Sequence, residues 1–125
     1  MSPKRPRPAE PDSSSFLPLP KATFHILVSL ADRERHGYSI MLDVSERTDG
    51  TLRFSPSTLY ASIKRLLDQE LIEELDERPD PRHDDERRRY YRLTHLGRRV
   101  AVAEARRLER LLADARATGL LPQKG

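Results

Sequence analysis

Hydroxyl and basic side chains gather on one face of the segment FSPSTLYASIKRLL, residues 54–67. The segment contains no Asp or Glu, and its apolar residues recur at helical spacing on the opposite face. Such a face is either an ordinary solvated surface or a surface that donates hydrogen bonds to phosphates and base edges. The candidate contact residues are Ser55, Ser57, Thr58, Tyr60, Ala61, Lys64 and Arg65.

These residue types predict different contacts. Base edges are expected to meet Ser57, Thr58, Ala61 and Arg65, and phosphates to meet Lys64 and Tyr60. Two members also fit structural roles: Ser55 is placed to cap the helix, and the ring of Tyr60 lies at the border of the apolar stripe.

A second basic group lies further along the chain, at Arg82, Arg87, Arg88 and Arg89, flanked by Arg78 and Arg92. Arginine in a loop suits phosphate contact or insertion into a minor groove. Across residues 78–92, however, six arginines face four acids. The acids either pair locally and hold the loop off DNA until binding, or only keep it soluble.

The elements that must position these side chains follow from periodicity. Apolar patterns predict helices over 23–32, 38–47 and 56–69, strands over 71–76 and 88–93 with a long polar loop at 77–87, and a last helix over 95–118. Ser55 with Pro56 and Thr94 are the expected helix starts, and Gly119 is the expected stop. Gly37 is expected to allow close approach of two helices or a positive φ. Tyr38, Tyr90 and Tyr91 are expected in the core or the sheet.

Three short helices followed by a β-hairpin predict a mainly α fold, a winged helix-turn-helix domain, over residues 21–94. The third helix then enters the major groove and the hairpin is the wing. Residues 1–20 contain six of the ten prolines and are expected to be a disordered basic tail, with a DNA-contacting arm as the alternative. Residues 119–125 form a second tail.

The helix over 95–118 carries an apolar stripe longer than a small domain needs, with arginines and glutamates on its flanks. This helix either closes the domain's own core or pairs with a second copy of the chain. A homodimer would let a protein that binds the major groove contact two half-sites. The candidate dimerisation residues are Leu96, Val100, Ala103, Leu108, Leu111, Leu112 and Ala115.

Composition limits the other classes of function. The 125 residues carry a net charge of +3, no cysteine, and four histidines without the spacing of a helical metal site. No Ser/His/Asp spacing or glycine-rich phosphate loop is present, so we predict no enzyme, no metal and no cofactor. No apolar run is long enough for a bilayer and no signal peptide is recognisable, so a cytoplasmic protein without a membrane partner is expected.

Three stretches, HGYSIMLDV, FSPSTLYASIKRLLDQELIEE and RRYYRLTHLGRRVA, resemble the PadR family of bacterial transcriptional regulators. The matching motifs are Gly37-Tyr38, Thr58-Leu59-Tyr60 and the run from Tyr90 to Gly97. The resemblance extends from Phe24 to the end and fits the short form of the family, which has one C-terminal helix. Ser57 and Ala61 depart from the family's usual glycine and proline.

The resemblance implies a homodimer built through the C-terminal helix and repression of nearby genes, often relieved by a small ligand. We therefore expect a sequence-specific repressor that reads a pseudo-palindromic operator, with helix 56–69 in the major groove and the 76–89 wing on the flanking backbone or minor groove. The alternative is a winged-helix protein-interaction module that does not bind DNA. The effector is unidentified, and the absence of Trp excludes the tryptophan-lined pocket known in some family members.

Overall fold

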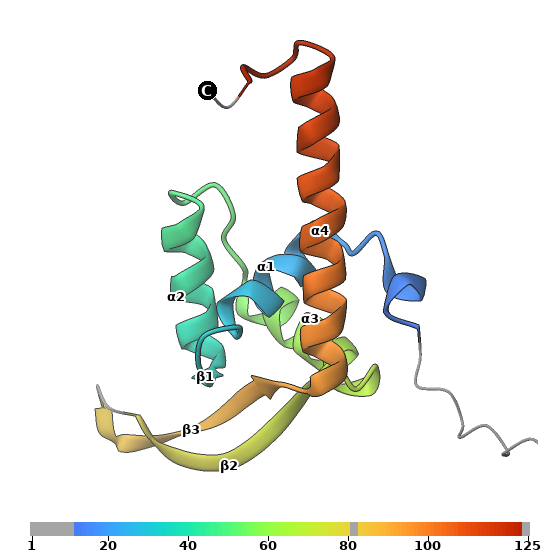
Figure 1. Cartoon of the computed structure of the whole chain (residues 1–125). Helices are drawn as coiled ribbons and strands as arrows, with labels where there is room; N and C mark the ends of the chain where they lie inside the picture. Colours follow the sequence, from blue (N-terminus) through green and yellow to red (C-terminus); the bar gives the residue numbers. More distant parts are fainter. Residues whose placement is uncertain (1–11, 81–82, 124–125) are drawn as a thin grey trace, which may run out of the picture.

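A computed structural model describes residues 12–80 and 83–123, without the side chains of 79–87. One 3-10 turn, four helices and three strands follow one another along this part of the chain (Figure 1). In order they are η1 (Ser13–Phe16), α1 (Lys21–Ser29), β1 (Arg35–His36), α2 (Gly37–Arg47), α3 (Pro56–Asp68), β2 (Ile72–Asp80), β3 (His83–Leu93) and α4 (His95–Ala117).

The helix boundaries have local causes. The Ser55 hydroxyl accepts a hydrogen bond from the Thr58 N–H at 3.2 Å, and Pro56 occupies the first helical position of α3. Thr94 caps α4 in the same way, accepting from the Gly97 N–H at 2.9 Å. Gly119 follows α4 with a φ of +87°, a conformation that glycine adopts without strain. Both predicted caps and the predicted stop are confirmed.

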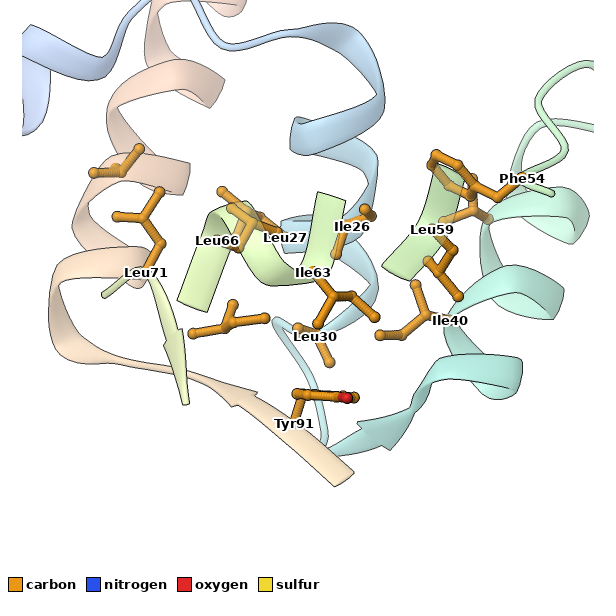
Figure 2. Packing of buried hydrophobic residues seen from close by; sticks show 13 residues of the cluster. Ile26, Leu27, Leu30, Ile40, Phe54, Leu59, Ile63, Leu66, Leu71 and Tyr91 are labelled. Carbon is orange, nitrogen blue, oxygen red and sulfur yellow. The ribbon is translucent and has the colours of Figure 1, made fainter. Parts of the chain in front are cut away.

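The core lies between the three short helices and the sheet (Figure 2). Each helix contributes a stripe of Leu, Ile or Val, and Tyr91 closes the core from the sheet side. Fully burying one such aliphatic side chain contributes roughly 1.5–3 kcal/mol, so this cluster is the main source of stability. The helical members include Ile26, Leu27, Ile40, Val44, Leu59, Ile63 and Leu66.

The sheet has the strand order β1-β3-β2, and both pairs are antiparallel. The sequence pattern missed β1, because two residues are too short to show any alternation. In β1, Arg35 pairs with Tyr91 and His36 pairs with Tyr90, which ties the start of α2 to the wing.

The prediction of a long loop over 77–87 is wrong, because β2 and β3 continue through most of these residues. The physical reason is cross-strand charge pairing in place of apolar alternation. Arg89 on β3 lies 3.2 Å from the Glu74 carboxylate and 3.7 Å from that of Glu77 on β2. The register shifts between Glu74 and Glu77.

Residues 12–20 are also placed differently from the sequence prediction, which assigned them to a disordered tail. Asp12 caps η1, and Phe16 and Leu19 pack against the core. The Leu19 N–H donates to the Glu104 carboxylate on α4 at 2.7 Å, so the segment is fixed to the domain by a buried charge. Residues 1–11 of the predicted tail lie outside the described residues.

The N-terminal part of α4 belongs to the core of its own domain. Val100 has no exposed surface, so its predicted place in a dimerisation stripe is wrong, whereas Leu96 is half-buried against the cluster. The helical period is the reason: α1 and β3 cover the first turns of α4, and the apolar residues there face them. Ala103 is half-buried.

Two glycines mark close approaches between elements. A Cβ on Gly97 would lie 1.8 Å from the Leu71 carbonyl oxygen, so only glycine lets α4 start against the end of α3. A Cβ on Gly37 would lie 2.6 Å from the Tyr60 hydroxyl. The expected close approach at Gly37 is therefore present, between α2 and α3.

Candidate nucleic-acid interface

The exposed face of α3 carries the side chains that the sequence singled out. Leu59, Ile63 and Leu66 point into the core, which turns the remaining positions outward. Within the described part of the chain, Lys64 and Arg65 form no ion pair, so both charges are directed at solvent. The exposed candidates are Ser55, Ser57, Thr58, Tyr60, Ala61, Lys64 and Arg65.

Hydroxyl groups cluster at the N-terminus of α3. The Ser55 hydroxyl donates to the Thr58 hydroxyl at 2.9 Å and lies 3.3 Å from that of Ser57. The first turn of α3 contains no acid, so the positive end of the helix dipole is not neutralised by a neighbouring carboxylate. This end of the helix is therefore suited to an anionic partner.

Tyr60 combines two roles. Its side chain is 49% exposed, yet its hydroxyl lies beside the Gly37 backbone at the start of α2. The ring thus fixes the angle between α2 and α3 while leaving one edge in solvent. The predicted border position of Tyr60 is where the structure places it.

The wing arginines are not equivalent. The Arg88 guanidinium lies 5.8 Å from the centre of the Tyr38 ring, a cation–π distance. The charge of Glu74 raises the pKa of Arg89, which also pairs with Glu77. Arg82 and the side chain of Arg87 lie outside the described residues.

The flanking arginines are held by a residue that the sequence analysis missed. Glu34, just before β1, lies 2.6 Å from the Arg78 guanidinium and 3.7 Å from that of Arg92. Arg92 also pairs with Glu73, and the hydrogen bond that Arg92 donates to this carboxylate raises the pKa of Arg92. These acids come from β2 and from the turn after α1, whereas sequence reasoning considered only acids near the wing tip. Only the tertiary fold brings Glu34 to the wing.

Tyr38, Tyr90 and Tyr91 occupy different environments. Tyr91 is buried, and burial raises the pKa of its hydroxyl. Tyr90 is half-buried beside His36, with the two ring centres 5.3 Å apart and edge to face. Tyr38 is 44% exposed, so its expected place in the core or sheet is wrong: it begins α2 on the solvent side.

Other kinds of site were sought over the described residues. They contain no group of three or more His, Asp or Glu side chains placed to hold a metal ion. None of the helices in residues 12–80 and 83–123 is long and apolar enough to cross a membrane.

Three packed helices, an antiparallel wing and a third helix with no acid before its last residue, Asp68, define a winged helix-turn-helix protein. The chain belongs to the transcriptional regulator PadR-like family, whose sequence model matches residues 26–103. The resemblance noted from the motifs is thereby confirmed. The family is one of transcriptional regulators, which sets the functional class as regulation and not catalysis.

The chain is also similar to one curated protein over part of its length and to solved structures in fold. An uncharacterised protein from Lysinibacillus sphaericus is 36% identical over 73 residues, which cover 58% of this chain and 64% of that relative. A PadR family transcription regulator from Clostridium difficile R20291 superposes with a TM-score of 0.62 at 21% identity, covering 79% of this chain and 97% of that one. Bacillus subtilis PadR, solved in complex with operator DNA, superposes with a TM-score of 0.55 at 23% identity, covering 69% of this chain and 47% of that one.

Proposed function

We propose that this protein is a homodimeric, sequence-specific repressor that binds a pseudo-palindromic operator. The observation that carries the proposal is the exposed face of α3, which has no acid before Asp68 at its C-terminal end, opposite a buried apolar stripe. A helix with this division docks on its own domain with one side and offers donors to the major groove with the other. The operator complex of Bacillus subtilis PadR, a protein of similar fold, supports a DNA partner for this chain.

On α3, the proposed division of labour follows side-chain chemistry. Thr58, Ser57 and Ala61 contact base edges, where small side chains allow close approach, and Arg65 reaches a base or a flanking phosphate. Lys64 neutralises phosphate as a point charge. Tyr60 offers its exposed edge to the backbone, and the capping hydroxyl of Ser55 lies at the end nearest the groove floor.

On the wing, phosphate binding is an exchange of partners. Arg88 and Arg89, with Arg82 and Arg87, are the proposed contacts on the flanking backbone or minor groove. Arg89 already pairs with Glu74, so a phosphate must displace a carboxylate to bind it. The wing therefore contributes less to affinity than its number of arginines implies, and α3 contributes more.

The second half-site comes from a second copy bound through the C-terminal half of α4. Figure 1 shows this half extending past α1. Leu111 is 56% exposed and Leu112 is 47% exposed, an apolar pair with no partner within the described chain. Leu108 and Ala115 continue the stripe at helical spacing, as in a paired helix. The cytoplasm is the compartment in which such a repressor acts.

The test is a gel shift of the chain on DNA from upstream of its own gene, with a shuffled fragment of equal length as the control. We expect preferential binding to the upstream fragment and a binding constant whose logarithm falls linearly with the logarithm of salt concentration. Weak binding that ignores salt would instead identify a protein-interaction module and overturn the proposal.

A further inference from the structure

A cavity of about 360 Å³ opens where β1, the start of α2 and β3 meet. In Figure 1 this is the region in which β1 lies beside the N-terminal end of α2, next to the wing. The side chains that matter for its chemistry are Glu34, His36, Tyr38, Asp43, Glu46 and Tyr90. Its walls therefore include two phenol rings and three carboxylates.

Two basic residues line the cavity, and both have acidic partners: Arg33 is exposed and lies 3.6 Å from the Asp32 carboxylate, whereas Arg35 is held inside the fold. Arg35 donates through Nε to the Ser29 carbonyl at 2.6 Å and through Nη1 to the Ser39 hydroxyl at 3.2 Å. Its Nη2 lies 3.3 Å from the Asp43 carboxylate and 3.6 Å from that of Asp32. These contacts involve all three nitrogens, and the side chain is only 12% exposed, so Arg35 is engaged within the fold and is not presented to a ligand.

The helix end in the cavity is also occupied. His36 Nδ1 accepts the Ser39 N–H at 3.1 Å, which satisfies a donor that an anion would otherwise use. In contrast, the Glu46 carboxylate is exposed and has no ion-pair partner in the described part of the chain. Among the described residues that line the cavity, with Arg33 paired to Asp32, the charge left without an ion-pair partner is therefore the negative charge of Glu46.

The two rings already hold cations. The Arg78 guanidinium lies 5.0 Å from the centre of the Tyr90 ring, and that of Arg88 lies 5.8 Å from the centre of the Tyr38 ring. Arg78 also pairs with Glu34 at 2.6 Å. An aromatic ring and a nearby carboxylate are the groups that recognise organic cations.

We infer that this cavity binds a small organic cation, a planar amidinium, guanidinium or alkylammonium compound. The ligand is held by the Tyr38 and Tyr90 rings and by Glu46. It competes with Arg78 for Tyr90 and Glu34, so its binding changes how the base of the wing is held. Ligand binding itself does not depend on the proposed function, whereas the effect on DNA affinity rests on that function. The coupling is reciprocal: if the ligand changes the affinity for the operator, the operator changes the affinity for the ligand by the same factor.

The test titrates the full chain with benzamidine, which is cationic at neutral pH, and with benzoate, which has the same ring and the opposite charge. Backbone amide shifts are followed by NMR. Saturable shifts at Tyr38, Ser39 and Tyr90 with benzamidine alone support the inference. Equal or stronger shifts with benzoate would identify an anion site, and no shifts with either probe would leave no ligand site; both results overturn it.

Two variants sharpen the test. Glu46→Gln and Tyr38→Leu, both at exposed positions, should each weaken benzamidine binding by about threefold or more. Glu109→Gln, which removes an exposed carboxylate from α4, is the matched control and should leave binding unchanged. Unchanged binding in both cavity variants would contradict the assignment of the site.

The link to DNA is read separately. Operator affinity is measured with and without saturating benzamidine. A changed affinity in the wild type but not in Tyr38→Leu supports the coupling, and an unchanged affinity overturns the coupling while the site stands. Failure to bind the operator without benzamidine would instead count against the proposed function.

Discussion

Gly97 shows how strictly one residue can be determined by its neighbours. The Leu71 carbonyl oxygen that excludes its Cβ also accepts the Thr94 N–H at 3.1 Å, and the Thr94 hydroxyl donates to the Glu70 carbonyl at 2.7 Å. The end of α3 and the start of α4 are therefore joined through backbone groups that cannot move independently.

We predict that Gly97→Ala destabilises the domain by about 3 kcal/mol, the upper end of typical overpacking costs. Alanine is the better helix former, so any loss must come from the clash and not from propensity. Urea denaturation measures the change. The reverse substitution at an exposed position of α4, Ala105→Gly, should cost only about 1 kcal/mol, and a similar loss for both would contradict this account.

Glu104 is the other residue whose role is set by its environment. It is 1% exposed, and the hydrogen bond from Arg107 lowers the pKa of its carboxyl, against the opposing effect of burial. The Leu19 N–H adds to the lowering. A lowered pKa in the folded state means that the charged carboxylate stabilises the fold above its ordinary pKa, and that this stability is lost as pH falls through the lowered value.

Glu104→Gln should therefore cost about 2 kcal/mol at neutral pH and progressively less as the solution is made acidic. Glutamine keeps the shape and an acceptor for Leu19 but loses the charge-assisted bond. Denaturant titrations of both proteins across the carboxyl range give the difference. Glu109→Gln serves as an exposed control on the same helix. If the difference in the free energy of unfolding between wild type and Glu104→Gln did not change with pH, this role of Glu104 would be wrong.

Among the elements, α3 is the one on which the proposed function depends. Its buried and exposed faces are separated sharply enough to assign distinct roles to neighbouring residues. In the proposed complex Lys64 meets phosphate on any sequence, whereas Thr58, whose hydroxyl accepts a hydrogen bond from that of Ser55, meets the base edges.

We expect Lys64→Ala to weaken binding to operator and non-operator DNA alike and to lower the salt slope by about one. Thr58→Ala should reduce the preference between them with less loss of non-specific affinity. Fluorescence anisotropy at several salt concentrations separates the two effects. Lys21→Ala, at the exposed start of α1, is the control, and an unchanged low-salt affinity for Lys64→Ala would show that α3 is docked differently.

Sequence patterns predicted the helices well because a stripe such as Leu59, Ile63 and Leu66 records the burial of a whole face. A cap such as Ser55 or Thr94 acts on the neighbouring turn of backbone, so its position can also be predicted from the local sequence. The wing was underestimated because its outer part is held by charge pairs between distant residues, which leave no alternation of apolar residues. Glu34, β1 and the Leu19–Glu104 bond depend on contacts between segments far apart in the chain, and no local pattern reveals them.

At the scale of the whole molecule, α4 divides into two parts. Its first turns belong to the core through Val100, whereas Leu111 and Leu112 further along contact no core residue. A sequence stripe of apolar residues does not distinguish these parts, because both have the same spacing.

We predict that Leu111→Glu converts the protein to a monomer with an unchanged fold and lowers operator affinity at least tenfold, because one half-site is lost. Analytical ultracentrifugation gives the mass, and circular dichroism checks the fold. Ala113→Glu adds the same charge on a different side of α4 and should leave the dimer intact. A Leu111→Glu protein that remains dimeric would place the interface elsewhere.

The two-residue strand β1 joins the start of α2 to a part of the chain that is synthesised much later. Arg35 pairs with Tyr91, a partner 56 residues later (91 minus 35), and His36 both caps α2 and contacts the ring of Tyr90. Joining such distant residues has an entropic cost that local helix formation does not. A nascent chain still lacking β3 can form α1, α3 and the local His36 cap of α2, but not the pairs that tie β1 to the sheet. If the chain binds DNA as proposed, we expect fragments that end before β3 to bind the operator weakly.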